Sequence, residues 1–296
     1  MLRRRQWIVP EAPTSAQLNG VAVADGRPYV VGNRGVLLGR IGGGWIRLLS
    51  DGVDGERRGL LDIEPTDDGE RLWLCGTRGA LGYYDRESET VTDCSAPYGL
   101  ASRLRTLSVT GTAGEEQLHV ADDRGRVARV AVDGEEPTVR GVAVPGPNEP
   151  ITALRAADGL LFAADTTGRI HQSDDGREWR TDRLASGMVT ALAVDADGLL
   201  AATRDGTAYT GIRSFSSPPD RLAPLPDGVR PTAADGRDHT AVVVGGDGAL
   251  LARGRDPGFQ RVGVESPVGL YGVALTPDGD VYAVGAEGVV VEGRTT

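Results

Sequence analysis

The chain has 296 residues, a formal net charge of −10 and 43 glycines, and aromatic residues make up only 5% of it. Its acidity argues against non-specific nucleic-acid binding, which needs a basic field. No apolar run approaches the ~20 residues needed to span a bilayer, so no membrane insertion is expected.

The N-terminus carries three consecutive arginines, Arg3 to Arg5, followed by the short apolar stretch Trp7-Ile8-Val9. Paired arginines occur in twin-arginine export signals. Here Pro10 and Glu11 interrupt the apolar region that such a signal requires. We therefore expect no signal peptide, and either a cytoplasmic protein or one assembled into a virion.

An apolar strand, a turn that ends in glycine and a second apolar strand recur seven times. The turn glycines are Gly35, Gly79, Gly125, Gly168, Gly206, Gly248 and Gly288. Their spacings are 44, 46, 43, 38, 42 and 40 residues. A period of about 40–45 residues is typical of a four-stranded propeller blade. A two-residue hairpin turn with positive φ explains why glycine recurs at this site.

The repeat predicts an all-β fold, a single seven-bladed β-propeller with four-stranded antiparallel blades. The predicted blades span approximately residues 15–50, 57–98, 102–147, 150–186, 188–228, 230–265 and 268–296, the last completed by residues 1–12. A further short strand rich in Ala and Val precedes each hairpin. We place it innermost, because small side chains fit where seven strands converge on a narrow axis.

The last repeat lacks a fourth strand, because only eight residues follow Gly288. The segment Gln6–Pro10 resembles the outer strand that begins at Trp45. We expect it to pair with residues 288–293 and to close the ring, which protects both free edges. We expect three aromatic residues of outer strands to serve structural closure: Trp7, Trp45 and Trp179.

The segment Gln172-Ser173-Asp174-Asp175-Gly176-Arg177-Glu178-Trp179 resembles an Asp-box, or BNR repeat, with Gln and Glu in place of the usual Ser and Thr. The wider blade pattern is similar to propellers of the photosystem II stability/assembly-factor type. This resemblance implies the fold, and it implies a structural turn in which Asp and Ser bind backbone donors and Trp packs between strands.

Catalytic constellations are missing from the sequence. Sialidases need an arginine cluster and a Tyr nucleophile beside a Glu. No such Glu lies beside the tyrosines that fall on strands, which are Tyr29, Tyr83, Tyr84, Tyr209, Tyr271 and Tyr282, and Tyr98 lies in a loop.

The three histidines, His119, His171 and His239, occupy three different repeats and lack the spacing of metal ligands. We interpret Cys75 and Cys94 as buried free thiols. We expect no enzyme and no cofactor, and a propeller hydrolase is the least favoured class.

Calcium at the axis is an alternative, because hard oxygen ligands converging there could hold the ion. The possible ligands are Asn19, Asp62, Glu64 and Asp195. The simpler interpretation makes them ordinary strand-end and loop residues of an acidic protein, and Asp195 to Gly198 a hairpin turn. We therefore predict no metal.

The residue before each turn glycine changes sign around the ring. It is Arg34, Arg78 and Arg124 in blades 1–3, Thr167 in blade 4, and Asp205, Asp247 and Glu287 in blades 5–7. Arg204, next to Asp205, is a basic residue within the acidic half. These turns share one face of a propeller. The basic arc could orient an acidic partner, whereas the simpler interpretation is that exposed turns are merely polar.

The sequence favours a non-enzymatic scaffold for protein–protein interaction or assembly, whose partner is another protein or a second copy of the chain. The alternative is a structural or receptor-recognition protein of a virion or surface appendage. The chain has no lysine. Together with the acidity, this favours a salt-loving source organism over one whose GC-rich genome encodes arginine in place of lysine. The proline-rich connections 145–150 and 214–231 are interpreted as stiffened blade junctions rather than docking loops.

Overall fold

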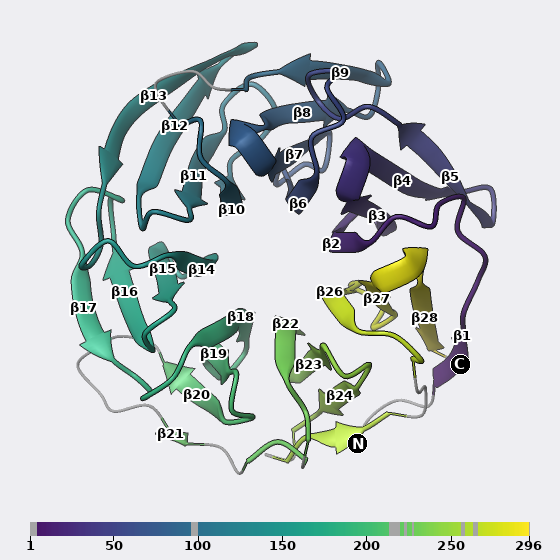
Figure 1. Ribbon diagram of the computed structural model, residues 1–296, viewed down its shortest axis with the longest axis vertical. Helices are drawn as coiled ribbons and strands as arrows, with labels where there is room; N and C mark the ends of the chain where they lie inside the picture. The colour runs from purple at the N-terminus through teal and green to yellow at the C-terminus, as the bar shows by residue number, and fades with distance from the viewer. Residues whose placement is uncertain are drawn as a thin grey trace.

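Seven four-stranded antiparallel sheets surround a central axis in the computed structural model of the protein (Figure 1). The structure describes residues 5–95, 100–212, 220–221, 224–226, 228–255, 258–262 and 266–295. The predicted seven-bladed propeller is therefore confirmed. Within these ranges no helix has the length and hydropathy of a membrane span. Tyr98 and part of the second proline-rich connection lie outside the described residues.

Each blade runs from an innermost to an outermost strand. Blade 1 contains β2 (Leu18–Ala24), β3 (Arg27–Gly32), β4 (Val36–Ile41) and β5 (Gly44–Leu49), and blade 2 contains β6 (Leu60–Pro65), β7 (Arg71–Gly76), β8 (Leu81–Asp85) and β9 (Thr90–Asp93). Blade 3 contains β10 (Leu104–Thr110), β11 (Gln117–Asp122), β12 (Val127–Asp133) and β13 (Glu136–Ala143), and blade 4 contains β14 (Ile151–Ala157), β15 (Leu160–Asp165), β16 (Arg169–Ser173) and β17 (Arg180–Arg183).

The remaining blades follow the same order. Blade 5 contains β18 (Val189–Asp195), β19 (Gly198–Thr203), β20 (Ala208–Ile212) and β21 (Asp220–Arg221), and blade 6 contains β22 (Pro231–Arg237), β23 (Thr240–Gly245), β24 (Leu250–Arg253) and β25 (Gln260–Arg261). Blade 7 contains β26 (Leu270–Leu275), β27 (Val281–Gly285), β28 (Val290–Thr295) and the N-terminal β1 (Arg5–Ile8). The hydrophobic core is divided into seven clusters, each lying between two neighbouring blades.

The turn between the second and third strands of a blade contains three residues, not the two that we predicted. In blade 2 the Gly76 N–H donates to the Ala80 carbonyl, which encloses Thr77 to Gly79. Short 3₁₀ turns form here in three blades: η1 (Asn33–Gly35), η2 (Thr77–Gly79) and η4 (Ala286–Gly288). All seven turn glycines have positive φ, from 74° to 84°. The predicted conformational reason for glycine is thus correct, although the turn is longer.

A second reason for glycine is the close approach of the next blade. A Cβ on Gly79, whose φ is 74°, would overlap the Leu100 carbonyl oxygen. Gly26 has a similar φ of 69°, but a Cβ there would meet nothing. We expect Gly26→Ala to cost about 1 kcal/mol of unfolding free energy and Gly79→Ala to cost roughly 2 kcal/mol more, measured by urea unfolding. Equal losses in the two variants would contradict the packing role of this glycine.

The N-terminal strand completes the last blade, as predicted, but in a shifted register. β1 pairs with β28 through Arg5 opposite Thr295 to Ile8 opposite Glu292, whereas we expected residues 288–293. The Trp7 ring covers Gly293, where any Cβ would overlap the indole. The side chain packs against the cluster between blades 6 and 7. Trp7 therefore packs at the place where β1 completes the last blade, and its contribution to closure stays a prediction.

The seam between blades 7 and 1 also contains a buried carboxylate. Glu292 Oε1 accepts hydrogen bonds from Arg40 Nε at 2.6 Å and from Trp45 Nε1 at 2.9 Å. Trp45 packs edge-to-face on Tyr282, with ring centroids 6.4 Å apart. Blades 2 and 3 are joined by the same combination of Arg71, Trp73 and Glu116. The seam thus uses the same three residue types as the interface of blades 2 and 3, where the donors lie on the earlier blade and the carboxylate on the later one.

Trp179 has no part in closure. It lies immediately before β17 and packs against the cluster between blades 3 and 4. In the turn before it, Ser173 Oγ accepts the Gly176 N–H at 2.8 Å, and Asp175 Oδ1 accepts the N–H groups of Arg177 and Glu178. The Asp-box-like turn therefore uses Ser173 and Asp175, one residue along from the alignment through Gln172 and Asp174.

His119 on β11 predicts a pH dependence of stability. Burial, and then the neighbouring Arg129, lower its pKa from 6.5 to about 4. The unfolded chain therefore binds more protons between these values, and stability is lost as the pH falls from about 6.5 towards 4. We expect wild type to lose on the order of 2 kcal/mol from this group between pH 7 and 5, and His119→Gln to lack that loss.

Urea midpoints at the two pH values measure this difference. The exposed His239 provides the matched control, since His239→Gln is expected to keep the wild-type pH dependence. The assignment to His119 is wrong if its variant keeps that dependence too.

Candidate functional site

A β-bulge recurs in the innermost strand of every blade. Each pairing register skips one residue, for example between Leu104 and Thr106. The skipped residues are Asn19, Leu61, Arg105, Thr152, Thr190, Thr232 and Tyr271. All seven line the cavities of the central channel. A bulge changes the direction in which a side chain points. Here the seven side chains form one ring, called the bulge ring, near the end of the channel that faces the three-residue turns.

Several side chains of this ring also fasten neighbouring blades together. Asn19 Nδ2 donates to the Leu60 carbonyl at 2.7 Å, and Thr152 Oγ1 donates to the Val189 carbonyl at the same distance. Thr232 Oγ1 lies 2.6 Å from the Leu270 carbonyl. Each acceptor directly precedes the bulge of the next blade. Because these donors are used in blade-to-blade contacts, the threonine hydroxyls cannot also donate to a ligand.

The channel centre holds three carboxyl groups, Asp62, Glu64 and Asp235, and the guanidinium of Arg155, and Arg237 also lines the cavity. Arg155 pairs with Glu64. Asp62 Oδ2 accepts from Thr106 Oγ1 at 2.7 Å, and Asp235 Oδ2 accepts from the Leu275 N–H at 2.8 Å. Together they line a cavity of about 240 Å³.

Burial governs the protonation of these acids. It raises the pKa of Glu64 to about 7, with the Arg155 charge opposing and the nearby Asp62 and Asp235 reinforcing the shift. Burial likewise raises the pKa of Asp62 and of Asp235. The centre is thus a mixed-charge network in which a carboxyl group gains or loses a proton near neutral pH.

The four possible calcium ligands do not come together. Asn19, Asp62 and Glu64 line the channel. Asp195 lies at the far end of β18, where it is buried and paired with Arg253 of the next blade. Among the residues that the structure describes, no three His, Cys, Asp or Glu side chains converge as metal ligands.

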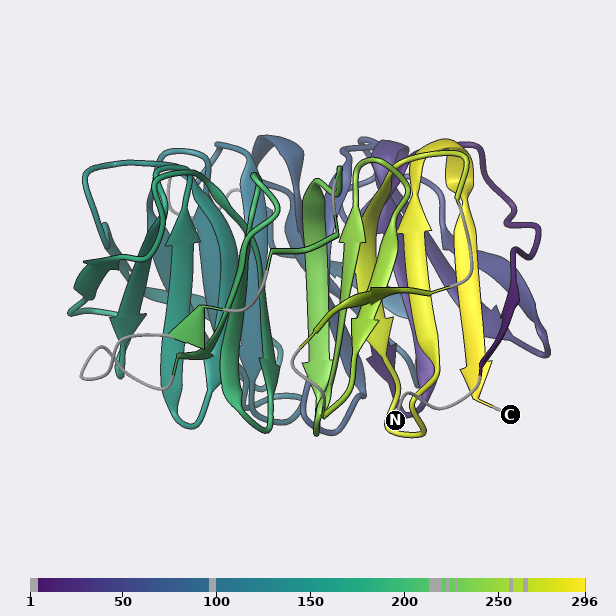
Figure 2. The same cartoon turned by 90° about the horizontal axis from the view of Figure 1, so that it is seen from below.

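The turn residues that change sign around the ring all lie on one face, here called the turn face. It is the upper face in Figure 2, where the 3₁₀ turns are seen. The exposed residues on it are Arg34, Arg78, Arg124, Arg204, Asp205, Asp247 and Glu287. Arg34, Arg78 and Glu287 have left-handed φ values of 63°, 55° and 57°. The backbone therefore fixes where these side chains emerge.

Two of the three acidic turn residues already use their carboxylates, while Glu287 has no partner among the described residues. Asp205 Oδ1 accepts from the Thr203 hydroxyl at 2.5 Å, and Asp247 Oδ1 accepts the Arg230 N–H at 3.3 Å. By contrast, the guanidinium groups of Arg34, Arg78 and Arg124 have no hydrogen-bond or ion-pair partner among the described residues. We call these three residues the basic arc, and its charges are available to a ligand.

Sequence reasoning missed the arginines inside the ring of turns. Arg105 and Arg230 join Arg204 in lining the channel mouth on the turn face, and Arg155 lies at the centre. One feature of the sequence did indicate these arginines: Arg105 and Arg155 lie on innermost strands, where small residues were expected. Their orientation depends on the bulges, which the glycine repeat does not reveal.

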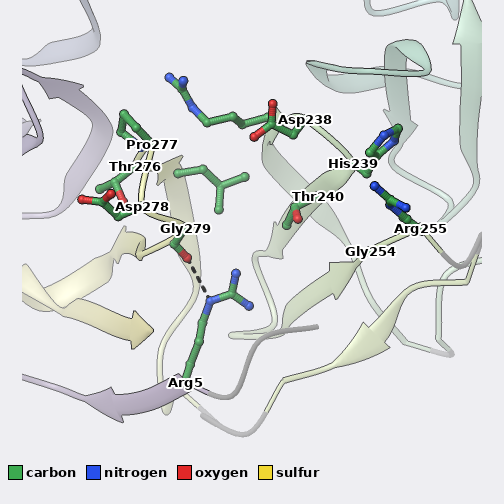
Figure 3. Close-up of a pocket in the computed structure, with 12 residues that line it drawn as sticks. Arg5, Asp238, His239, Thr240, Gly254, Arg255, Thr276, Pro277, Asp278 and Gly279 are labelled. Atoms are coloured by element: carbon green, nitrogen blue, oxygen red, sulfur yellow. Dashed lines mark hydrogen bonds between the residues drawn. The ribbon is translucent and has the colours of Figure 1, made fainter. Parts of the chain in front are cut away.

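The opposite face carries a separate pocket of about 240 Å³ between blades 6 and 7 (Figure 3). Arg5 of β1 points into it, and its Nε donates to the Gly279 carbonyl at 3.1 Å. Arg237 and Arg255 share the lining with Asp238 and Asp278. Since opposite charges line it together, we assign its polar contacts to holding β1 rather than to a ligand.

His171 is fully buried between two side chains in an arrangement that superficially matches a hydrolytic triad. Its Nδ1 lies 2.8 Å from Thr181 Oγ1, and its Nε2 lies 3.3 Å from Asp165 Oδ2. However, Thr181 Oγ1 donates to the Pro145 carbonyl at 3.0 Å, and His171 is inaccessible to a substrate. The network fastens the turn of blade 4. Cys75 and Cys94 are buried free thiols, as predicted.

No protein-family model and no curated protein matches this chain. Solved structures do resemble it. A virginiamycin B lyase from Staphylococcus aureus with quinupristin is 10% identical, with a TM-score of 0.82 and coverage of 99% of this chain and 100% of that one. YCF48 bound to D1 peptide is 15% identical, with a TM-score of 0.78 and full coverage of both chains.

The WD40 repeats of RRP9 are 11% identical, with a TM-score of 0.79 and coverage of 100% and 99%. At these identities the likeness establishes the propeller fold alone. YCF48 is a photosystem II assembly factor, so one of these neighbours is of the expected kind. Membership of the Asp-box family is not established. The neighbours include an enzyme as well as proteins that bind a peptide or join assemblies.

Proposed function

We propose that this protein is a non-enzymatic binding module that docks an acidic segment of a partner protein on its turn face. The observation that carries the proposal is the basic arc: three exposed guanidiniums on consecutive blades, without a partner among the described residues, in a protein with net charge −10. Guanidinium groups pair with carboxylates through two parallel hydrogen bonds. YCF48, a neighbour of the same fold, binds D1 peptide.

The charge pattern favours one orientation of the partner. The exposed carboxylates of Asp205, Asp247 and Glu287 repel an acidic segment from blades 5–7 and direct it to blades 1–3. Exposed pairs contribute about 0.2–1 kcal/mol each and are screened by salt. The module therefore binds through several weak pairs, and its affinity falls as ionic strength rises.

Charge reversal tests the proposal. Fluorescence anisotropy measures binding of a labelled peptide of Glu and Gly residues, and the same peptide with Gln for Glu serves as a baseline. We expect the triple variant Arg34→Glu, Arg78→Glu, Arg124→Glu to bind the acidic peptide about tenfold or more weakly.

The matched control reverses three exposed arginines away from the turn face, Arg27, Arg140 and Arg177. It changes the net charge by the same amount and is expected to keep most of the affinity. Equal weakening in both triples would show a general charge effect and contradict the proposal. A second copy of this chain could also supply the acidic surface, and a dimer in sedimentation of the protein alone would assign the basic arc to self-association instead.

A further inference from the structure

The channel mouth on the turn face is a cavity of about 550 Å³, within the size range of small-molecule sites. Three arginines from three blades line it: Arg105 at the bulge of β10, Arg204 after β19 and Arg230 before β22. The remaining lining includes Tyr271 and the threonines of the bulge ring.

Among the described residues, none of the three guanidiniums has a hydrogen-bond or ion-pair partner, and neither does the Tyr271 hydroxyl. Arg105 is half-buried, and Arg204 and Arg230 are exposed. Elsewhere in the protein, buried or half-buried arginines hold an acceptor, as Arg40 holds Glu292, Arg253 holds Asp195 and Arg129 holds the Arg140 carbonyl. Half-buried Arg105 differs from these sites, because its guanidinium has no acceptor among the described residues.

Like charges also crowd this mouth. Burial, and then the positive charges of Arg103 and Arg204, lower the pKa of Arg105, with Asp123 in partial opposition. A bound anion would relieve this repulsion and accept the unused N–H groups. Thr152 and Thr232 donate their hydroxyl protons to the next blade, and Thr190 donates its own to the Ala202 carbonyl of the same blade. The arginines and Tyr271 are therefore the donors that face the cavity.

We propose that the channel mouth binds a compact, multiply charged oxyanion group of a small molecule, of the phosphate class. Planar guanidiniums arriving from three sides suit an acceptor with several equivalent oxygens. The cavity exceeds the size of one phosphate, so a phosphate ester fits as well as the free ion. This site lies inside the ring of turns and does not depend on a protein partner bound to the basic arc.

Calorimetric titration with inorganic phosphate, and then with a simple phosphate monoester, tests the site at ionic strength held constant with chloride. Wild type should bind both, and thermal unfolding should rise saturably with phosphate as expected for a ligand of the folded state. The double variant Arg105→Gln, Arg204→Gln should lose at least about tenfold in affinity. Without phosphate it should be no less stable than wild type, because mutual repulsion is removed.

The control is Arg34→Gln, Arg78→Gln, which removes two arginines from the same face outside the cavity. It should bind phosphate like wild type while weakening the acidic peptide, so failure of this site and failure of peptide docking are distinguishable. Three results would overturn the proposal: undiminished phosphate binding by the double variant, equal loss in the control, or a chloride effect as large as that of phosphate.

Discussion

Deletion of residues 1–12 is expected to lower the melting temperature by on the order of 10 °C, because it removes the fourth strand of the last blade. The loss combines the ladder between β1 and β28, the packing of Trp7 on Gly293 and the anchoring of Arg5 to the Gly279 carbonyl. It also exposes β28 as a free edge. We therefore expect aggregation to accompany the loss of stability. Differential scanning calorimetry and light scattering measure the two effects.

Two point variants on the same strand separate burial from strand pairing. Trp7 is half-buried against the cluster between blades 6 and 7, so Trp7→Ala should lose about 2–3 kcal/mol, less than the 3–5 kcal/mol usual for a fully buried aromatic residue. Ile8, 37% exposed on the other side of β1, serves as the control, and Ile8→Ser should stay within about 1 kcal/mol of wild type. A truncated protein that melts like the full chain would refute closure by the N-terminus.

Replacement of Glu292 is the second change with a large expected effect. Its carboxylate is fully buried and accepts from Arg40 and Trp45 of blade 1 and from Arg294 at 2.8 Å. Burial raises the pKa of Glu292, but the hydrogen bonds from Arg40 and Arg294 outweigh it and keep the pKa below its usual value. Glu292→Ala would leave a guanidinium and an indole N–H without their acceptor. We expect a loss of roughly 3–5 kcal/mol in urea unfolding.

Two control variants separate the loss of the Glu292 contacts from the general effect of removing a negative charge. Glu136→Ala removes an exposed carboxylate from the outer strand β13 and should change stability by less than about 0.5 kcal/mol. Glu116→Ala, at the equivalent junction of blades 2 and 3, should match the loss of Glu292→Ala. A wild-type-like Glu292→Ala protein would mean that the seam is held by apolar packing alone.

The blade count and the ring closure could be predicted because each follows from a local requirement. A positive φ and a close backbone approach demand glycine once per blade, so the repeat is visible in the sequence. The outer strand missing after Gly288 pointed to the N-terminus. The register of β1 could not be predicted in the same way, because a short strand such as Arg5–Ile8 has few side chains that distinguish one alignment from the next.

The channel could not be predicted, because side-chain direction on the innermost strands depends on the bulges. Without the skipped residue at Arg105, strict alternation would place different side chains in the channel. The pairing of Arg155 with Glu64 joins residues 91 positions apart, on blades that are not consecutive. The basic arc was found because turn residues keep a fixed offset from the repeat glycine. Its use by a partner stays a prediction.

Hydrogen–deuterium exchange with the acidic peptide of Glu and Gly bound tests the central claim most directly, because it reports which face the partner covers. We expect slower exchange at the turns of blades 1–3, residues 33–35, 77–79 and 123–125, and unchanged exchange at the hairpins of the opposite face, such as residues 66–69. Protection confined to the opposite face, or to the acidic turns of blades 5–7, would contradict docking on the basic arc.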